Sequence, residues 1–305
     1  MQKQIDRAVA EVSTVLLGKE VQVRLALCCL IAKGHLLIED LPGMGKTTLS
    51  NALAKVLGLE YKRVQFTSDL LPADILGVSI FNRDSAQFQF IPGPVFTQVL
   101  LADEINRTTP KSQSALLEAM EEGQVTIEGE TRELPAPFFV IATQNPSSQS
   151  GTYPLPESQL DRFLMRLSLG YPDREAERKL LLGEDSRRKL ARLQQVMTTQ
   201  ELVAIQRAVE DIHCSDSLID YVQRLVEYSR TQADLSCGLS PRGALALLRC
   251  AKTWALMLGR GHVVPEDIQM VLPSVVEHRL NTSVDYKSGS HGISQQLLEQ
   301  VAVIV

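Results

Sequence analysis

The sequence predicts an α/β domain with a central, mostly parallel sheet, followed by an all-helical domain. Up to about residue 171, short apolar runs alternate with segments whose apolar residues recur at helical spacing. Some of these runs, such as residues 99–102, are almost entirely apolar, as in strands that are buried on both faces of a parallel sheet. Beyond residue 172 only the helical spacing persists. We therefore expect two domains, residues 1–171 and residues 172–305.

Within the first domain, five apolar runs are expected to form the sheet, at residues 35–38, 61–66, 99–102, 138–142 and 165–169. Helices are expected over residues 3–17, 20–33 and 46–57, from Pro110 onward, and in a short segment holding Asp161, Arg162 and Phe163. Turn-forming residues between short apolar runs predict two hairpins, over residues 78–91 and 125–134. Helices of the second domain are expected at residues 173–183, 198–212, 216–231, 242–259, 265–279 and 294–303.

Composition is ordinary for a soluble globular protein, with 44% hydrophobic and 22% charged residues in 305. The formal net charge of −5 argues against a strongly basic nucleic-acid-binding surface. We expect no signal peptide and no membrane insertion, because the first residues are amphipathic and no apolar run approaches the roughly 20 residues that span a bilayer. The five cysteines lack C-x-x-C spacing, which favours buried free thiols in a cytoplasmic protein.

The stretch HLLIEDLPGMGKTT, residues 35–48, combines an apolar strand, a glycine-containing loop and a helix start. Backbone N–H groups of such a loop and the positive end of the helix dipole face one anionic point. Lys46 is expected to reach the β- and γ-phosphates of a nucleotide, and the Thr47 hydroxyl to ligate Mg²⁺. Asp40 stands where the usual G-x-x-x-x-G-K-[ST] pattern has its first glycine, so the motif alone leaves the interpretation open.

Two adjacent carboxylates, Asp103 and Glu104, follow the buried strand at residues 99–102. Ligands of open α/β sheets bind at this end of the strands. Asp103 is expected to hold the Mg²⁺ shell, and Glu104 to polarise the attacking water as a general base. The alternative is a solvated turn without a chemical role. A water-activating glutamate favours hydrolysis over transfer to a small-molecule acceptor.

Three further polar residues are candidates for the same reaction. Asn145 ends the next strand and could orient the attacking water, although Asn-Pro alone is most often a turn. Arg162 could stabilise the charge of the transition state in a neighbouring subunit. Arg242 follows Ser240-Pro241 at a helix start, from which it could reach the phosphates of its own subunit. For each arginine the alternative is a surface ion pair.

The order of these motifs resembles that of the MoxR-type branch of the AAA+ ATPases, within the helix-2-insert clade. The resemblance covers nearly the whole chain and includes EDLPGMGKTTL, VLLADEINRTTPKSQSALLEAMEEGQVT, ATQNP, YPLPESQLDRFLMR and SPRG. In that branch the form ED-x-P-G-x-G-K-T is common, so Asp40 matches the motif of that branch. The resemblance implies a P-loop domain with three αβα layers, followed by a helical lid domain.

The resemblance also implies a role for each matching position. Asp103 and Glu104 match the Walker B motif, Asn145 matches sensor 1, Arg162 matches the arginine finger and Arg242 matches sensor 2. The hairpin at 78–91 matches the insert in the second helix, and the hairpin at 125–134 matches the pre-sensor-1 hairpin. The Walker A loop is matched by Pro42, Gly43, Met44, Gly45, Lys46, Thr47 and Thr48.

The roles of three residues expected near Glu104 are left open by the sequence. Arg107 could contact a neighbouring subunit or brace Glu104, and either Gln65 or Thr67 could restrain Glu104 until a partner engages. A trans-acting finger would place each active site between subunits, which implies a head-to-tail ring whose assembly ATP promotes, typically a hexamer in this family.

The implied activity is hydrolysis of ATP with Mg²⁺, giving ADP and phosphate. In this family the energy remodels or assembles protein partners or matures their metal cofactors, and the partners often contain a von Willebrand A domain. The alternative is a nucleic-acid translocase, but the first hairpin offers only Arg83 beside Asp84, and the second is mostly acidic. A small-molecule phosphotransferase is disfavoured by Glu104, Arg162 and the SPRG motif.

Overall fold

The protein was analysed as a computed structural model that describes residues 1–84, 86–145, 151–182, 186–232, 235, 237–280 and 292–303. Its centre is a five-stranded sheet with strand order β2-β5-β8-β1-β9, in which every neighbouring pair is parallel. The predicted strands are therefore confirmed, with small shifts at their ends. Their bounds are β1 (Leu36–Glu39), β2 (Tyr61–Gln65), β5 (Val99–Asp103), β8 (Phe139–Gln144) and β9 (Met165–Leu167).

Alternate residues of the central strands enter two separate hydrophobic cores, one on each face of the sheet. In β5, Val99 and Leu101 belong to one core, whereas Leu100 and Ala102 belong to the other. This alternation follows from the two-residue repeat of a strand, and burial of both faces explains why the runs are apolar throughout. Helices cover both faces, so the three-layer αβα arrangement is confirmed.

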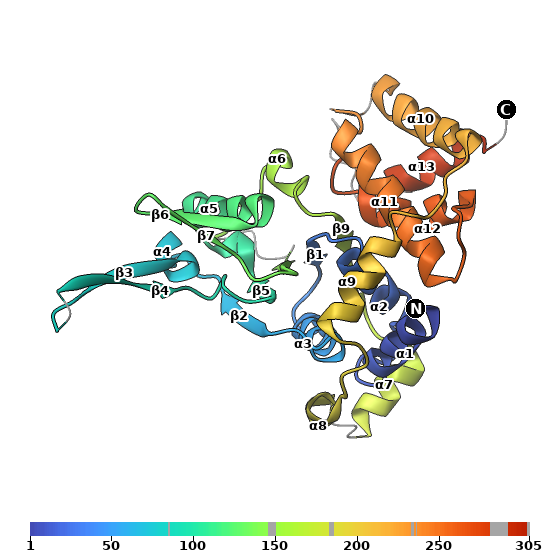
Figure 1. The fold of residues 1–305 in the computed structure, drawn as a ribbon. Helices are drawn as coiled ribbons and strands as arrows, with labels where there is room; N and C mark the ends of the chain where they lie inside the picture. Colours follow the sequence, from blue (N-terminus) through green and yellow to red (C-terminus); the bar gives the residue numbers. More distant parts are fainter. Residues whose placement is uncertain are drawn as a thin grey trace.

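One face is covered by α1 (Gln2–Ser13), α2 (Glu20–Ile31) and α3 (Lys46–Val56), and the other by α5 (Pro110–Glu122). The short elements α4 (Pro72–Leu76), η1 (Ile105–Arg107) and α6 (Glu157–Leu160) connect the strands. Both predicted hairpins are present, as β3 (Gly77–Asn82) with β4 (Gln87–Pro92) and β6 (Gln124–Ile127) with β7 (Glu130–Glu133). The β3–β4 hairpin projects far from the sheet (Figure 1).

The short helix predicted to hold Arg162 ends earlier than expected. Helix α6 stops at Leu160, and Asp161, Arg162 and Phe163 form the connection to β9. The backbone carbonyls of Asp161 and Phe163 instead accept hydrogen bonds from the side chain of Arg279, at 3.3 and 2.7 Å. A distant side chain thus binds the carbonyls of this connection, outside any regular helix.

After β9 the described residues form mainly helices, and His213 and His262 form an isolated bridge. Helix α8 was not expected, because its short sequence is mostly charged and, among the side chains that the structure describes in it, only Leu190 packs against the core. One core continues from α1 and α2 into these helices, so the predicted domain boundary at residue 171 stays a prediction. The helices are α7 (Arg174–Leu181), α8 (Ser186–Arg192), α9 (Thr199–Ala208), α10 (Asp216–Thr231), α11 (Pro241–Met257), α12 (Pro265–Val276) and α13 (Ile293–Gln300).

All five cysteines are free thiols, as predicted, but the expectation that they are buried is wrong for Cys214 and Cys237. Cys28, Cys29 and Cys250 are buried, and burial raises the pKa of each. Cys214 is half-buried and Cys237 is exposed. None of the helices in the described ranges combines the length and the hydropathy that crossing a bilayer requires.

Candidate active site

The candidate site lies at the C-terminal edge of three adjacent strands, β1, β5 and β8. The amide of Asp40, directly after β1, donates to the carbonyl of Gln144 at 3.2 Å, which joins the ends of β1 and β8. The hydroxyl of Thr143 in β8 donates to Oδ1 of Asp103 in β5 at 2.6 Å. The parallel pairing therefore brings the phosphate loop, the two carboxylates and Asn145 to one edge of the sheet, as predicted.

The phosphate loop depends on two glycines with left-handed backbone angles. Gly43 has a φ of +84° and Gly45 a φ of +93°, conformations that other residues adopt only with strain. A Cβ atom on Gly45 would lie 2.7 Å from Cδ1 of Leu16, whereas none would be crowded at Gly43. Gly45 is the N-cap of α3, so the unpaired N–H groups of the first helical turn face the loop. This geometry fits a phosphate group.

The remaining loop residues surround this position. Pro42 is exposed, and Met44 is half-buried and packs against the core. Thr47 and Thr48 are half-buried in the first turn of α3. Thr47 thus carries its hydroxyl at the helix end that faces the loop.

Lys46 is held by carbonyl oxygens rather than by a carboxylate. Its Nζ donates to the carbonyl of Asp40 at 2.5 Å and to that of Gln144 at 3.1 Å. Partial burial lowers the pKa of Lys46, and the nearby charges of Asp40, Asp103 and Glu104 oppose that shift. Among the described residues no acid forms an ion pair with this ammonium group, so it is suited to an incoming phosphate.

Asp40 has a structural task that explains why it replaces the first glycine of the motif. Its Oδ2 accepts hydrogen bonds from the amides of Leu169 and Gly170, both at 2.6 Å, and from the hydroxyl of Ser168 at 3.2 Å. Its Oδ1 accepts from the amide of Leu41 at 2.8 Å. The carboxylate therefore ties the start of the phosphate loop to the chain that follows β9.

Asp103 is buried, and both of its carboxylate oxygens accept hydrogen bonds from neighbouring side chains. Oδ2 accepts from Nε and a terminal nitrogen of Arg63 at 3.2 and 2.7 Å, while Oδ1 accepts from Thr143. No group of three or more His, Cys, Asp or Glu side chains is gathered as a metal site within the described ranges. Asp103 and Thr47 carry carboxylate and hydroxyl oxygens, which are ligand types that Mg²⁺ takes in proteins.

Glu104 has a strained backbone conformation, and three neighbours contact its backbone or its side chain. Its φ of 57° and ψ of 49° are left-handed, which is uncommon for a residue other than glycine and is typical of functional sites. Its amide donates to Oγ1 of Thr143 at 2.8 Å. Its Oε2 accepts from Nε2 of Gln65 at 2.9 Å and pairs with Nε of Arg107 at 3.0 Å.

These contacts show which of the candidate neighbours lie against Glu104. Gln65, rather than Thr67, contacts Glu104, and Thr67 hydrogen-bonds Asp69 instead. Arg107 braces Glu104 within the same subunit. Asn145 is buried directly after β8, one residue beyond the carbonyl that holds Lys46, and its Asn-Pro partner at position 146 lies outside the described residues.

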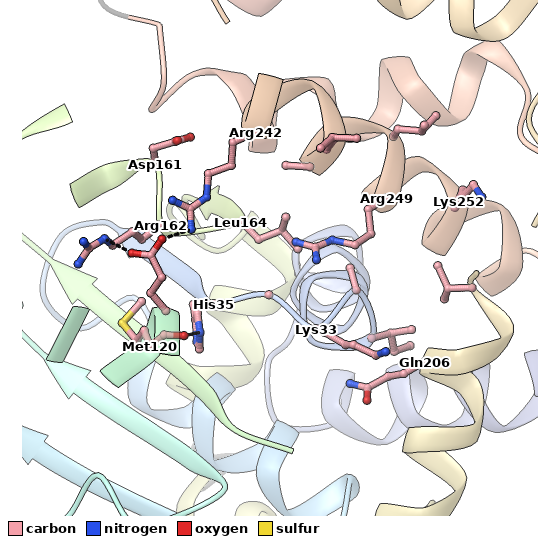
Figure 2. A pocket seen from close by; sticks show the side chains of 18 of the residues that line it. Lys33, His35, Met120, Asp161, Arg162, Leu164, Gln206, Arg242, Arg249 and Lys252 are labelled. Carbon is pink, nitrogen blue, oxygen red and sulfur yellow. Dashed lines mark hydrogen bonds and ion pairs between the residues drawn. The ribbon is translucent and has the colours of Figure 1, made fainter. Parts of the chain in front are cut away.

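Arg162 and Arg242 lie together at the opposite edge of the sheet. Nε of Arg162 is 3.0 Å from Oε2 of Glu121, and a terminal nitrogen of Arg242 is 3.1 Å from Oε1 of the same carboxylate. Glu121 is in the last turn of α5, beside Met120, whose carbonyl accepts from His35 at the start of β1 (Figure 2). The strand starts and the strand ends are opposite edges, which separates both arginines from Lys46.

This placement corrects one expectation. Arg242 does not approach the phosphate loop of its own subunit, because α11 begins beside Glu121 at the other edge of the sheet. The helical spacing near residue 242 predicted the helix start but not the edge against which it packs. Arg162 also lies away from its own loop, as expected for a residue that acts on a neighbour.

A cavity of about 890 Å³ extends from the arginine pair along α11. Figure 2 shows Arg249 and Lys252 on the same helix beyond Arg242, with Lys33 and Gln206 across from them. Basic side chains outnumber acidic ones in its lining, so the cavity favours an anionic or acidic occupant.

Sequence reasoning missed three residues that contact predicted site residues or their chain neighbours: Arg63, Glu121 and Arg279. Arg63 carried a weak signal, since it alternates with Gln65 and therefore faces the same side of β2. Arg279 is almost fully buried and pairs with Asp161 at 2.7 Å, next to Arg162 in the chain. That pair spans 118 positions of sequence, and no local pattern indicates it.

Comparison with known proteins agrees with the geometry. Residues 35–165 match the family described as "ATPase family associated with various cellular activities (AAA)", and residues 227–300 match "AAA lid domain". A solved structure of a protein from Cytophaga hutchinsonii superposes with a TM-score of 0.88 and 36% identity, over 99% of this chain and 95% of that one.

Three curated relatives align over most of the chain. The Bacillus subtilis (strain 168) protein YeaC is 46% identical, covering 90% of this chain and 86% of the relative. Chaperone MoxR1 of Mycobacterium tuberculosis is 40% identical, covering 92% of this chain and 76% of the relative. Protein MoxR of Paracoccus denitrificans is 32% identical, covering 96% of this chain and 93% of the relative. With the parallel sheet, the phosphate loop and the helical lid in place, the chain belongs to the MoxR-type AAA+ ATPases.

Proposed function

We propose that the protein binds ATP with Mg²⁺ at the C-terminal edge of β1, β5 and β8 and hydrolyses it to ADP and phosphate. The observation that carries this proposal is the gathering of Lys46, Asp103 and Glu104 at one edge, beside a loop that two glycines with left-handed backbone angles shape. A lone glycine loop would bind phosphate, but the strained and braced Glu104 adds the means to activate water.

Each residue then has one task. The loop from Pro42 to Thr48 binds the phosphates, with Lys46 turning from its two carbonyl partners toward them. Thr47 and Asp103 would hold Mg²⁺, which would neutralise charge on the phosphates. Glu104 takes a proton from the attacking water, and Asn145 orients that water.

Gln65 and Arg107 control the position of the Glu104 carboxylate. Both donate to the same oxygen, Oε2, so they hold the carboxylate in one rotamer. We propose that Gln65 restrains Glu104 until a partner shifts β2, while Arg107 keeps the carboxylate aligned.

The two arginines are assigned to the neighbouring subunit. Arg162 and Arg242 both contact Glu121, at the edge opposite their own phosphate loop, so they point to the same external site. Head-to-tail contacts of this kind close into a ring when the rotation allows, and we propose a hexamer whose assembly ATP promotes. Each active centre then combines the loop of one subunit with the arginine pair of the next.

The work done by hydrolysis is proposed to be chaperone-like remodelling, assembly or metal-cofactor maturation of protein clients in the cytoplasm, including clients with a von Willebrand A domain. Support comes from the related chaperone MoxR1 and from the projecting β3–β4 hairpin. Phe88 is 71% exposed and Phe81 is 52% exposed on that hairpin, and their rings pack edge to face at 5.3 Å. An exposed apolar surface of this kind fits a protein partner. Residues 172–305 would act as the lid domain.

A grip on nucleic acid has no support from the hairpins. Arg132 of the second hairpin pairs with Glu130 and lies 4.1 Å over the ring of Phe90, so its charge is already engaged. The described tip of the first hairpin offers Arg83 beside Asp84. Backbone phosphates require several free cations in one track.

The experiment that tests the proposal combines Glu104→Gln with a concentration series. Wild-type turnover per subunit should rise as dilute monomers assemble with ATP, measured by phosphate release and light scattering. Glu104→Gln should bind ATP with normal affinity and hydrolyse it at least about a hundred-fold more slowly. Equal turnover per subunit at all concentrations would contradict the shared site, and normal turnover in Glu104→Gln would contradict the assignment of the base. The assembled, ATP-trapped variant is also the bait for isolating clients.

A further inference from the structure

Glu121 occupies a place that the proposed reaction does not yet use. Its two carboxylate oxygens contact two different guanidinium groups, Oε2 with Arg162 at 3.0 Å and Oε1 with Arg242 at 3.1 Å. The two arginines come from segments 80 residues apart in the chain, one before β9 and one in the first turn of α11. A single carboxylate therefore joins them.

The contact to Arg162 leaves the outer end of that guanidinium available. Its closest approach to Glu121 is through Nε, and its two terminal amino groups make no hydrogen bond to a described residue. Arg242 contacts Glu121 through one terminal nitrogen, and no second partner for it is found in the described part of the chain. Since each guanidinium has five N–H donors in a planar fork, most donors of both remain free for phosphate oxygens.

The carboxylate of Glu121 also balances the charges of Arg162 and Arg242. Two guanidinium groups that approach one phosphate also repel each other, and a carboxylate between them offsets that repulsion. The cluster retains one net positive charge, so it still attracts an anion. Arg249 adds a further cation along the same cavity without any acidic partner among the described residues.

Glu121 is itself held in a rigid setting. The carbonyl of its neighbour Met120 accepts from Nε2 of His35, and Nδ1 of the same ring accepts from the amide of Val140 at 2.9 Å. This half-buried histidine fixes the end of α5 to the starts of β1 and β8. A side chain on a fixed helix end can set the position of others more precisely than one on a loop.

We infer that Glu121 is a positioning residue that holds Arg162 and Arg242 in the arrangement needed to receive the phosphates of the neighbouring subunit's nucleotide. The inference rests on the proposed shared site. It predicts that the effect of changing Glu121 appears in the neighbour's active centre rather than in its own.

The test uses Glu121→Gln, which keeps the size of the side chain, and Glu122→Gln as the matched control. Glu122 is the adjacent, exposed residue of α5 and forms no ion pair with a described residue. Glu121→Gln should lower turnover at saturating ATP by about ten-fold or more, since small misplacements of catalytic groups have effects of that order. Its affinity for a fluorescent ATP analogue and its ATP-promoted assembly should match wild type, and Glu122→Gln should match wild type in all three measurements.

Mixed rings then locate the effect. Glu121→Gln and Arg162→Ala are each mixed with an excess of Glu104→Gln, which has an inactive site but intact arginines, and wild type in the same excess is the reference. Turnover per Glu121→Gln subunit should return to that reference, as should turnover per Arg162→Ala subunit. Mixing Glu121→Gln with Arg162→Ala should restore nothing, because both lack a competent arginine pair.

The outcomes distinguish a failure of the role of Glu121 from a failure of the shared active site. Rescue of Arg162→Ala without rescue of Glu121→Gln would overturn the role of Glu121 while leaving the shared site intact. Normal turnover in unmixed Glu121→Gln would overturn that role as well. Failure to rescue Arg162→Ala would contradict the shared site itself, and the inference with it.

Discussion

Replacing Asp40 by glycine would restore the usual first position of the phosphate-loop motif, yet we expect it to destabilise the protein. The carboxylate of Asp40 accepts hydrogen bonds from the amides of Leu169 and Gly170, each at 2.6 Å, and also from the amide of Leu41 and the hydroxyl of Ser168. Asp40→Gly removes the acceptor and leaves the Leu169 amide buried without a partner.

The expected loss follows from these two amides. A hydrogen bond to a charged acceptor contributes about 1.5–3 kcal/mol, and the orphaned donor of buried Leu169 would bear the full cost. Gly170 is half-buried, so water can partly replace the lost acceptor there. The free energy of unfolding should therefore fall by about 3–5 kcal/mol, which lowers the melting temperature by about 5–8 °C for a chain of this length. Asp40→Asn keeps an uncharged oxygen and should lose about half as much.

The assay is thermal and urea unfolding followed by circular dichroism, on wild type, Asp40→Asn and Asp40→Gly. The stability order should be wild type, then Asp40→Asn, then Asp40→Gly. A melting temperature of Asp40→Gly equal to that of wild type would refute the reasoning, because the motif would then matter only as a phosphate loop. Asp84→Gly at the exposed hairpin tip is the control for adding a glycine, and it should change stability little.

Two further changes probe the site and its surroundings. Lys46→Ala should abolish binding of a fluorescent ATP analogue while leaving the circular dichroism spectrum unchanged, and wild-type affinity in that variant would remove the anchor of the proposed site. Burial lowers the pKa of His35 to about 4, below the ordinary value of about 6.5, so the neutral ring stabilises the fold fully above pH 6.5 and this contribution is lost as pH falls toward 4. Wild type should lose on the order of 3 kcal/mol more than His35→Gln over that interval, and parallel pH profiles from urea titrations would exclude His35 as the source.

The strands and hairpins could be predicted because their signals are local. Residues such as Leu100 and Leu101 face opposite cores, so the whole run must be apolar, and that run is visible in the sequence. Helix α8 escaped prediction because its charged sequence has little apolar periodicity. The end of α6 was misplaced because Arg279, far along the chain, binds the carbonyls that follow it.

In the candidate site, too, some features could be predicted from local sequence and others could not. Lys46, Asp103, Glu104 and Asn145 follow strands that parallel pairing must align at one edge, so their proximity could be predicted. The side of the sheet reached by Arg242 depends on how α11 packs, and the sequence near residue 242 carries no information on that. The contacts of Glu121 with the two arginines could not be predicted either, because they form only where α5, α11 and the segment before β9 meet.

The distribution of the cysteines has a practical consequence for measuring motion. A thiol must ionise to react with an alkylating reagent, and burial that raises the pKa of Cys28, Cys29 and Cys250 keeps them protonated and out of reach. Cys237 is exposed, and its sulfur lies 3.8 Å from the carbonyl of Arg279, close to the segment that carries Arg162. A maleimide fluorophore on the unaltered chain would therefore attach preferentially beside this junction and report its movement during the ATP cycle.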